Sequence, residues 1–237
     1  MRTVPSRRPQ RAGLIAGLLP PAVAAAESAG DPPEAGPGLF PAEEAVMRTA
    51  GPPRRAEFAT GRLCARRALA SLGVPAAPIL PGPAGEPRWP EGVTGSITHC
   101  AGYRACAVAR ITDVAAIGID AEPDAALPAG LIEEVASGPE RAWIGRHAGA
   151  LPGADPPAVC WDRLLFSAKE AACKLWYPLT GQWPGLRGAV IALAAAGTFT
   201  VCLPGPGPGT GDRQVTRLTG RWLARDGLIV TAIVCTP

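Results

Sequence analysis

Two carboxylates stand two residues apart at the end of an apolar segment. Residues 114–119 are largely apolar, and Asp120 and Glu122 follow with Ala121 between them. In a strand, side chains two residues apart project from the same face, so both carboxylates point the same way. Adjacent carboxylates repel each other, and a hard cation with a preference for oxygen ligands, such as Mg²⁺, relieves the repulsion. Alternatively, the pair is only the polar end of a strand that turns at Pro123.

A carboxylate and an ammonium group form a second candidate pair in the segment 161–177, which has the apolar spacing of a helix. Glu170 and Lys174 are four residues apart and would share one face of that helix. The same spacing is typical of an ordinary surface ion pair. Ser167 with Glu170 also fits a capping box, although the apolar residues upstream already favour a helix.

The two lysines of the chain are themselves a signal. Lys169 and Lys174 are the only lysines among the 23 basic residues, and both lie in this one segment. A compact ammonium binds a phosphate as a point charge, which a planar guanidinium does not reproduce. The segment is therefore a candidate phosphate site, with chance clustering as the alternative.

A histidine marks a third candidate site, in the segment 95–100. His99 is one of two histidines in the chain. At the end of a strand it can donate a hydrogen bond to a phosphate oxygen, and Thr98 can add a hydroxyl group. In isolation, a structural histidine bonded to a carbonyl group is the simpler interpretation.

The elements that must position these residues follow from the apolar periodicity and from glycine and proline. A helix is predicted after Pro53 and is ended by Gly73, and Arg55, Arg62 and Arg66 would share one of its flanks, which could equally be a solvated face. Other helices are predicted over residues 41–50, 128–136, 140–147 and 161–177, the last bounded by Pro178. Strands are predicted near 14–23 and over 96–99, 105–108, 114–120, 189–194, 198–203, 217–223 and 228–234, with Asp226-Gly227 as a hairpin turn. Helices followed by strands in both halves indicate an α+β chain of two lobes of similar size, 1–113 and 114–237.

Composition excludes little but sets the class. The chain has 237 residues, of which 47% are hydrophobic, enough for a sizeable core. Its net charge of +3 gives no argument for binding nucleic acid or a membrane. The seven cysteines are odd in number and include no CxxC pair, so buried thiols in the reducing cytoplasm are expected.

The N-terminus allows two interpretations. Arg7, Arg8 and Arg11 precede an apolar run over 12–19, as in a secretory signal. Against a signal, Pro20 and the proline after it would break the helix that it needs. No uninterrupted apolar run is long enough for a membrane span.

Taken in order, the motifs resemble a known family. The segments 54–62, 95–100, 118–122 and 166–174, with Trp161 before the last, are similar to the motifs of Sfp/EntD-type 4′-phosphopantetheinyl transferases. The resemblance runs from about Leu14 to the C-terminus. Residues 177–180 and 220–222 are most similar to the actinobacterial branch.

The resemblance implies a fold and a reaction. Members are pseudo-dimers of two similar α+β lobes that bind coenzyme A in the cleft between them. They move phosphopantetheine from coenzyme A onto a serine of an apo acyl or peptidyl carrier protein and release 3′,5′-ADP. Such a protein would be a cytoplasmic monomer serving siderophore, non-ribosomal peptide, polyketide or fatty-acid synthesis. The N-terminal run would be a strand, which argues against a cleaved signal.

The family's catalytic roles carry over to matching positions. The resemblance implies that Asp120, Glu122 and Glu170 bind Mg²⁺. It also implies that Glu170, directly or through water, is the base for the serine. Lys174, with Lys169, would neutralise the pyrophosphate.

The resemblance also implies contacts with the rest of coenzyme A. His99 and Thr98 would bond its phosphates, and Arg54 and Arg62 would hold the 3′-phosphate of its adenosine. Pro81 stands where actinobacterial relatives often carry lysine, so a contact from that loop is in doubt. Two rival functions stay open: a non-catalytic coenzyme A-binding relative and a Mg²⁺-dependent phosphohydrolase.

Overall fold

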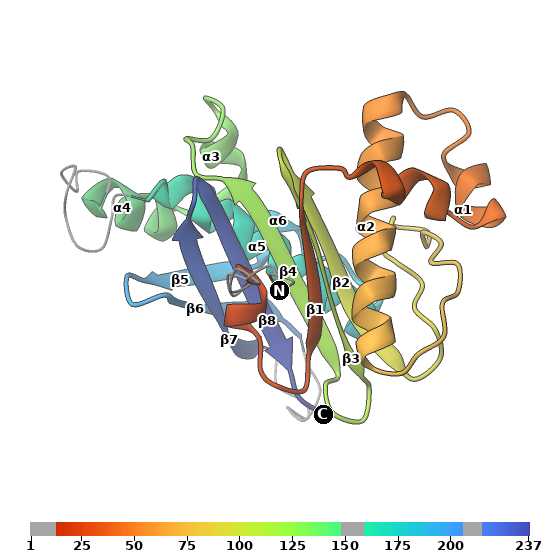
Figure 1. Cartoon of the computed structure of the whole chain (residues 1–237). Helices are drawn as coiled ribbons and strands as arrows, with labels where there is room; N and C mark the ends of the chain where they lie inside the picture. The colour runs from red at the N-terminus through yellow and green to blue at the C-terminus, as the bar shows by residue number, and fades with distance from the viewer. Residues whose placement is uncertain (1–12, 148–158, 206–214) are drawn as a thin grey trace, which may run out of the picture.

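Two antiparallel sheets, each covered by one 20-residue helix, make up the protein (Figure 1). The structure is a computed structural model that describes residues 13–147, 159–205 and 215–237. The predicted α+β fold of two similar lobes is confirmed. The arginines Arg7, Arg8 and Arg11 lie outside the described residues.

The first sheet has three strands in the order β1-β3-β2. These are β1 (Ala24–Ala29), β2 (Val93–Cys100) and β3 (Tyr103–Arg110). Its long helix is α2 (Pro52–Ser71), which has proline in its first turn and ends before Gly73, at φ 68°. Three short helical segments lie earlier in the chain: η1 (Ala16–Leu18), η2 (Pro33–Gly38) and α1 (Pro41–Val46).

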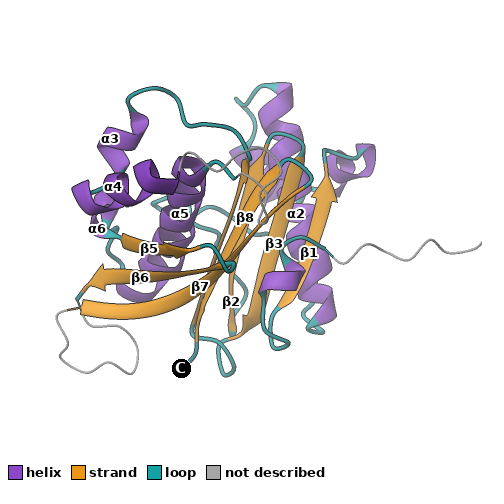
Figure 2. Cartoon of the chain, turned by 90° about the vertical axis from the view of Figure 1, so that its left-hand side faces the viewer, coloured by secondary structure: helices purple, strands orange, loops and turns teal. Residues whose placement is uncertain are grey.

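The second sheet has five strands in the order β4-β8-β7-β6-β5. They are β4 (Ala116–Pro123), β5 (Val190–Ala194), β6 (Thr198–Pro204), β7 (Val215–Arg225) and β8 (Leu228–Cys235). Its long helix is α5 (Trp161–Thr180), and α3 (Leu131–Val135), α4 (Gly138–His147) and α6 (Gly185–Gly188) lie on the same side of the sheet (Figure 2). The β7–β8 turn at Asp226 and Gly227 has positive φ at both residues, so the predicted hairpin is confirmed.

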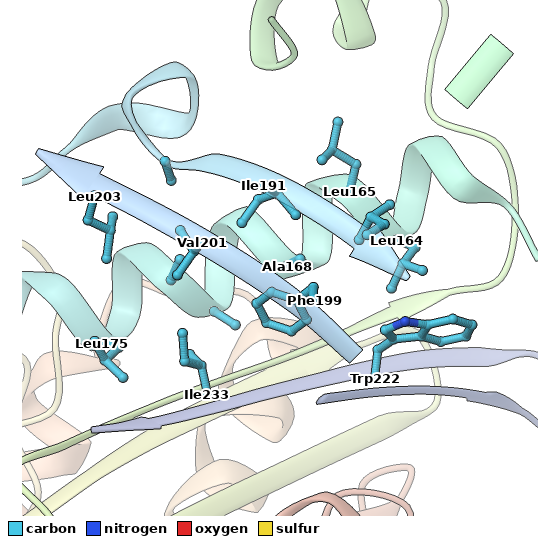
Figure 3. Close-up of a cluster of buried hydrophobic side chains, with 14 of the residues drawn as sticks. Leu164, Leu165, Ala168, Leu175, Ile191, Phe199, Val201, Leu203, Trp222 and Ile233 are labelled. Atoms are coloured by element: carbon cyan, nitrogen blue, oxygen red, sulfur yellow. The ribbon is translucent and has the colours of Figure 1, made fainter. Parts of the chain in front are cut away.

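Apolar side chains form three buried clusters that define the layers. One lies between α2 and the first sheet and a second lies between α5 and the second sheet, where Leu164, Ala168 and Leu175 face Phe199 and Val201 (Figure 3). The third lies between the two sheets. Each lobe is therefore a helix on a sheet, and the sheets meet in the middle of the molecule.

The alternation of side chains along β4 decides what faces α5. Ile117, Ile119 and Ala121 are buried in the cluster between the sheets. Gly118 lies on the opposite face, where an added Cβ would come within 1.9 Å of the Ala171 carbonyl oxygen of α5. Asp120, which shares the face of Gly118, therefore points at α5.

The predicted N-terminal strand over 14–23 is wrong. That segment contains η1, and the strand follows it as β1. The backbone N–H groups of Leu14, Ile15 and Ala16 all donate to the Glu27 carboxylate, which favours a helical turn over a strand. Ile15 and Leu18 are buried in the cluster between the sheets, so this run is part of the core.

One proline ends its element as predicted and one does not. β4 ends at Pro123, which pairs with Leu228 of β8. α5 continues through Pro178 to Thr180 and ends at Gly181, at φ 67°. Pro178 lies in the last turn of the helix, so it interrupts only one backbone hydrogen bond there.

No helix within the described ranges is long and apolar enough to cross a membrane. All seven cysteines are free thiols.

Candidate active site

β4 and α5 bring an aspartate and a lysine into direct contact. Asp120 is 4% exposed, and its Oδ1 accepts a hydrogen bond from Lys174 Nζ at 2.7 Å. The same oxygen accepts from Thr98 Oγ1 at 3.2 Å. Burial lowers the pKa of Lys174, but Asp120, Glu170 and Glu122 more than offset this and raise it. Lys174 is therefore a firmly charged ammonium among three carboxylates.

Glu122 lies one pleat further along the same face of β4. Its Oε2 accepts a hydrogen bond from Arg163 Nη1 at 2.9 Å, across 41 residues of sequence. Arg163 also donates to the carbonyl oxygens of Ala125 and Ala126, so it ties the end of β4 to the start of α5. Burial raises the pKa of Glu122 and Asp120 adds to the rise, while Arg163 and Lys174 oppose it.

Glu170 completes the acidic group from α5. Burial raises the pKa of Glu170, Lys174 opposes the rise, and the Asp120 carboxylate adds to it. Glu122 and Glu170 thus each interact electrostatically with Asp120 and with Lys174. A raised pKa suits a group that must accept a proton near neutral pH.

The chemistry of these carboxylates fits a hard divalent cation. Asp120 Oδ2 is buried without a hydrogen-bond partner among the described residues. An unpartnered buried carboxylate oxygen is costly, and a cation would satisfy it. As they stand, however, the His, Cys, Asp and Glu side chains described here include no group of three arranged to hold a metal ion. Lys174 and Arg163 occupy Asp120 and Glu122 instead.

Lys174 lies in the wall of a cavity between the two lobes. This cavity, of about 280 Å³, is lined from the first lobe by β2 residues including Ser96 and His99. From the second lobe it is lined by Lys174, Tyr177 and Trp183. The second lobe thus gives the cavity an ammonium group at Lys174 and aromatic rings at Tyr177 and Trp183.

A second cavity, of about 200 Å³, lies between α2 and the loop before β2. Arg54, Glu57 and Arg62 of α2 line it, together with Pro81 of the loop. His99 lines both cavities, so the two adjoin there. Together they form a groove with cationic groups at both ends, a shape suited to an elongated ligand with separated phosphates.

Family models match most of the described fold. One described as "4'-phosphopantetheinyl transferase N-terminal domain" matches residues 42–109. Another, described as "4'-phosphopantetheinyl transferase superfamily", matches residues 116–224.

Curated relatives match nearly the whole chain. The 4′-phosphopantetheinyl transferase Svp of Streptomyces mobaraensis is 49% identical over 222 residues, which cover 93% of this chain and 88% of Svp. The chain belongs to the 4′-phosphopantetheinyl transferase superfamily. PptT of Mycobacterium tuberculosis is 43% identical over 93% of this chain and 97% of PptT. Enterobactin synthase component D of Salmonella typhimurium, a more distant relative, is 32% identical over 79% of this chain and 74% of that protein.

The predicted family and reaction are thereby confirmed. The chain is an enzyme that transfers phosphopantetheine from coenzyme A to carrier proteins, and the non-catalytic alternative is not favoured. The structure brings Asp120 into contact with Lys174, with Glu122 and Glu170 beside them. In the adjoining cavity it gathers Arg54, Arg62 and His99. Of the first group, only Lys174 lines a cavity directly.

The phosphate contact predicted for Lys169 stays a prediction that the structure does not support. Its side chain is 0% exposed and lies 2.9 Å from Glu140 Oε1. Its Nζ also donates to the carbonyl oxygens of Leu186 and Ala189, at 2.9 and 2.6 Å. With all three N–H groups used inside the fold, this lysine has none left for a ligand.

The phosphate contact predicted for the Thr98 hydroxyl likewise stays a prediction that the structure does not support. Thr98 is 1% exposed and lines neither cavity. Its Oγ1 donates to Asp120 and accepts from the backbone N–H of Ala121 at 3.0 Å. It therefore orients the carboxylate of Asp120 from inside the protein.

Two charged residues near the groove were not predicted. Arg163 is seven residues before Glu170, and this spacing on a helix places them on one face. Glu57 is three residues after Arg54, a spacing that also shares a face. Both spacings can be read from the sequence, but neither shows which residue of another element lies opposite these side chains.

Proposed function

We propose that this transferase uses Mg²⁺ and that Asp120, Glu122 and Glu170 bind the ion. The observation that supports this most directly is the convergence of these acids from β4 and α5 on Lys174, in the wall of the cavity between the lobes. The orphaned Oδ2 of Asp120 offers a ligand oxygen. When bound, Mg²⁺ would stabilise the negative charge of the pyrophosphate.

The reacting groups have separate tasks. The carrier serine hydroxyl attacks the β-phosphorus of coenzyme A, and the bond from that phosphorus to the bridging oxygen of 3′,5′-ADP breaks. A hydroxyl is a weak nucleophile near neutral pH, and Glu170 accepts its proton directly or through water. Lys174 stabilises the charge that the leaving group gains. Thr98 and Lys174 together orient Asp120.

The adenosine end occupies the second cavity. Arg54 and Arg62 bond the 3′-phosphate there, and His99 reaches a phosphate from the junction of the two cavities. Burial lowers the pKa of Arg62 to about 10, Glu43 opposes this shift, and the group stays charged near neutral pH. Pro81 lines the same cavity but supplies no charge.

The acceptors are apo acyl or peptidyl carrier domains. The name of the relative enterobactin synthase component D favours a siderophore pathway, while non-ribosomal peptide and polyketide synthases are further acceptors. We place the enzyme in the cytoplasm as a monomer without nucleic-acid or membrane partners. We also place the division between its lobes at 113/114.

Isosteric variants test the metal and base assignments. We expect Asp120→Asn and Glu170→Gln to lower labelling of an apo-carrier with fluorescent coenzyme A by a factor of about 10² or more. Glu133→Gln removes an exposed carboxylate on α3 and should keep full activity. Binding of Mn²⁺, followed by its paramagnetic resonance signal, should weaken in both site variants. Near-normal labelling or unchanged Mn²⁺ binding by both would refute the assignment.

Product analysis separates the transferase from the phosphohydrolase alternative. A hydrolase would release free phosphopantetheine without any carrier. The proposed reaction predicts that 3′,5′-ADP accumulates only when apo-carrier is present, which mass spectrometry of the products can show.

A further inference from the structure

One carboxylate lies in the cavity that otherwise gathers cationic groups. Arg54, Arg62 and His99 line this cavity, and Glu57 is the one acidic residue among the described residues of its wall. Its side chain is 22% exposed, so water screens it only in part. A carboxylate is out of place in a pocket for an anion unless it has a task there.

Glu57 contacts two of the groups that would meet a phosphate, Arg54 and His99. Its Oε1 accepts a hydrogen bond from Arg54 Nη1 and lies 3.3 Å from His99 Nδ1. Arg54 Nη1 in turn lies 3.3 Å from His99 Nε2. The three side chains form a closed triangle between α2 and the end of β2.

The triangle assigns the proton of the imidazole. Since Arg54 can only donate, Nε2 of His99 accepts, which leaves the proton of a neutral ring on Nδ1, 3.3 Å from Glu57 Oε1. Burial lowers the pKa of His99, with Glu57 opposing and Arg54, Lys174 and Arg104 adding to the shift, which agrees with a neutral ring. In the free protein, Arg54 and His99 are therefore both engaged by Glu57.

An incoming phosphate must compete with this carboxylate. Both are acceptors for Arg54, and both are negative within one cavity of about 200 Å³. Two like charges at such separations repel appreciably where water is partly excluded. Without any anion, however, the cationic side chains of the empty cavity would repel each other.

We propose that Glu57 is a resident counter-ion: it holds Arg54 and His99 in place in the free enzyme, and the 3′-phosphate of coenzyme A displaces it from Arg54. This deepens the proposed function and rests on its assignment of the 3′-phosphate to this cavity. Glu57 thereby weakens the binding of coenzyme A and limits the preference of the enzyme for the 3′-phosphate. It is a positioning residue, since it acts through Arg54 and His99.

Paired ligands test this directly. Dissociation constants of coenzyme A and of dephospho-coenzyme A, which lacks the 3′-phosphate, are measured by isothermal titration calorimetry at fixed salt. Glu57→Gln should bind coenzyme A roughly tenfold more tightly, because the like charge is gone. Its affinity for dephospho-coenzyme A should change less than about twofold. In steady state, the KM for coenzyme A should fall with kcat nearly unchanged.

A matched variant controls for net charge. Glu44 pairs with Arg55 on the same lobe, and it lines neither of the two cavities of the groove. Glu44→Gln makes the same charge change and should leave both dissociation constants within about twofold. Glu57→Ala, a second variant at this partly exposed site, should shift affinity in the same direction as Glu57→Gln. Thermal unfolding checks that each variant is folded.

The possible outcomes distinguish the counter-ion role of Glu57 from the assignment of the 3′-phosphate to this cavity. If Glu57→Gln and Glu57→Ala bind coenzyme A with equal or lower affinity while the wild type still prefers it over dephospho-coenzyme A, the counter-ion role is overturned and the phosphate site stands. If the wild type binds both compounds equally, the 3′-phosphate is not held in this cavity, and the counter-ion role fails together with that assignment.

Discussion

At the scale of single residues, the two lysines of the chain have different partners because they lie on different faces of one helix. Lys169 and Lys174 are five residues apart on α5, a rotation of roughly 140° about the helix axis. Lys174 therefore reaches Asp120, while Lys169 points to Glu140 and the β5 side of the lobe. The side chain of Lys174 is 28% exposed at the groove, and that of Lys169 is fully buried.

Exchanging each lysine should separate catalysis from stability. We expect Lys174→Arg to lower kcat for carrier labelling by roughly tenfold or more, because a planar guanidinium cannot replace a point charge against Asp120. Lys169→Met should instead lower the free energy of unfolding by about 3 kcal/mol, because it leaves Glu140 without its buried cation. Initial rates and urea denaturation of both variants measure the two effects.

The opposite pattern would contradict this division. An inactive but fully stable Lys169→Met protein would mean that the buried ammonium takes part in the reaction.

Because the pKa of His99 is lowered in the folded protein, the stability of the fold should depend on pH. Burial lowers the pKa of His99 below its ordinary value of 6.5, so the unfolded chain takes up the proton first as the pH falls. The stability that the neutral ring contributes is thus present above about pH 6.5 and is lost progressively below it. We expect the Tm of His99→Asn to fall less between pH 7.5 and pH 5.5 than that of the wild type, as followed by circular dichroism. Parallel curves would show that His99 titrates alike in both states.

At the scale of elements, the close approach of β4 to α5 sets the geometry of the site. Gly118 lets the strand lie against the helix backbone at Ala171, one pleat before Asp120. A larger residue would push the two elements apart, and with them Asp120 from Lys174. The glycine is therefore a requirement of packing that also positions Asp120 against Lys174.

A single methyl group tests this packing. We expect Gly118→Ala to cost about 3 kcal/mol or more, because its Cβ would collide with backbone rather than with a flexible side chain. Transfer activity should fall in the protein that still folds. Gly138→Ala adds the same methyl group at the start of α4, where nothing lies within 4 Å, and should be neutral in both measurements. A fully stable Gly118→Ala enzyme would show that β4 and α5 can separate without cost.

At the scale of the whole molecule, hydroxyl groups join the two sheets across β2 and β4. Ser96 Oγ accepts from the backbone N–H of Ile119 at 3.2 Å, and Thr98 Oγ1 accepts from that of Ala121 at 3.0 Å. The two described sheets share no ladder of backbone hydrogen bonds. Hydrogen bonds from backbone N–H groups of β4 to side chains of β2 join them at this boundary instead. The groove lies over this seam, since Ser96 of β2 and Lys174 of α5 both line it.

Removing one hydroxyl should weaken both the seam and the site. We expect Thr98→Val to lower the free energy of unfolding by about 1–3 kcal/mol, because it leaves the buried N–H of Ala121 unpaired. Transfer activity should fall as well, since Asp120 loses an orienting donor. Thr60→Val is the matched control: Thr60 is equally buried, but its hydroxyl bonds Ala56 within α2. Equal effects of both variants on activity would argue against a special role for the seam.

The sequence alone was enough to predict most elements, the order of the motifs and the shared face of Asp120 and Glu122. These properties are local: period-two alternation, helical spacing, and the glycines and prolines that end elements all act over a few residues. The hairpin at Asp226 and Gly227 was predicted for the same reason, because positive φ at both positions suits a tight turn. The family resemblance then gave these local patterns a common function.

Only the tertiary structure decided which side chains are free to act. Periodicity shows which residues share a face of an element but not what packs against that face. It could not show that Lys169 forms a buried ion pair with Glu140, or that the Thr98 hydroxyl accepts a hydrogen bond from Ala121. It likewise could not place Glu57 between Arg54 and His99, a partner 42 positions along the chain on another element. Hydrogen bonds and ion pairs across such separations depend on how whole elements pack, and that is settled by the burial of the three apolar clusters rather than by any one segment.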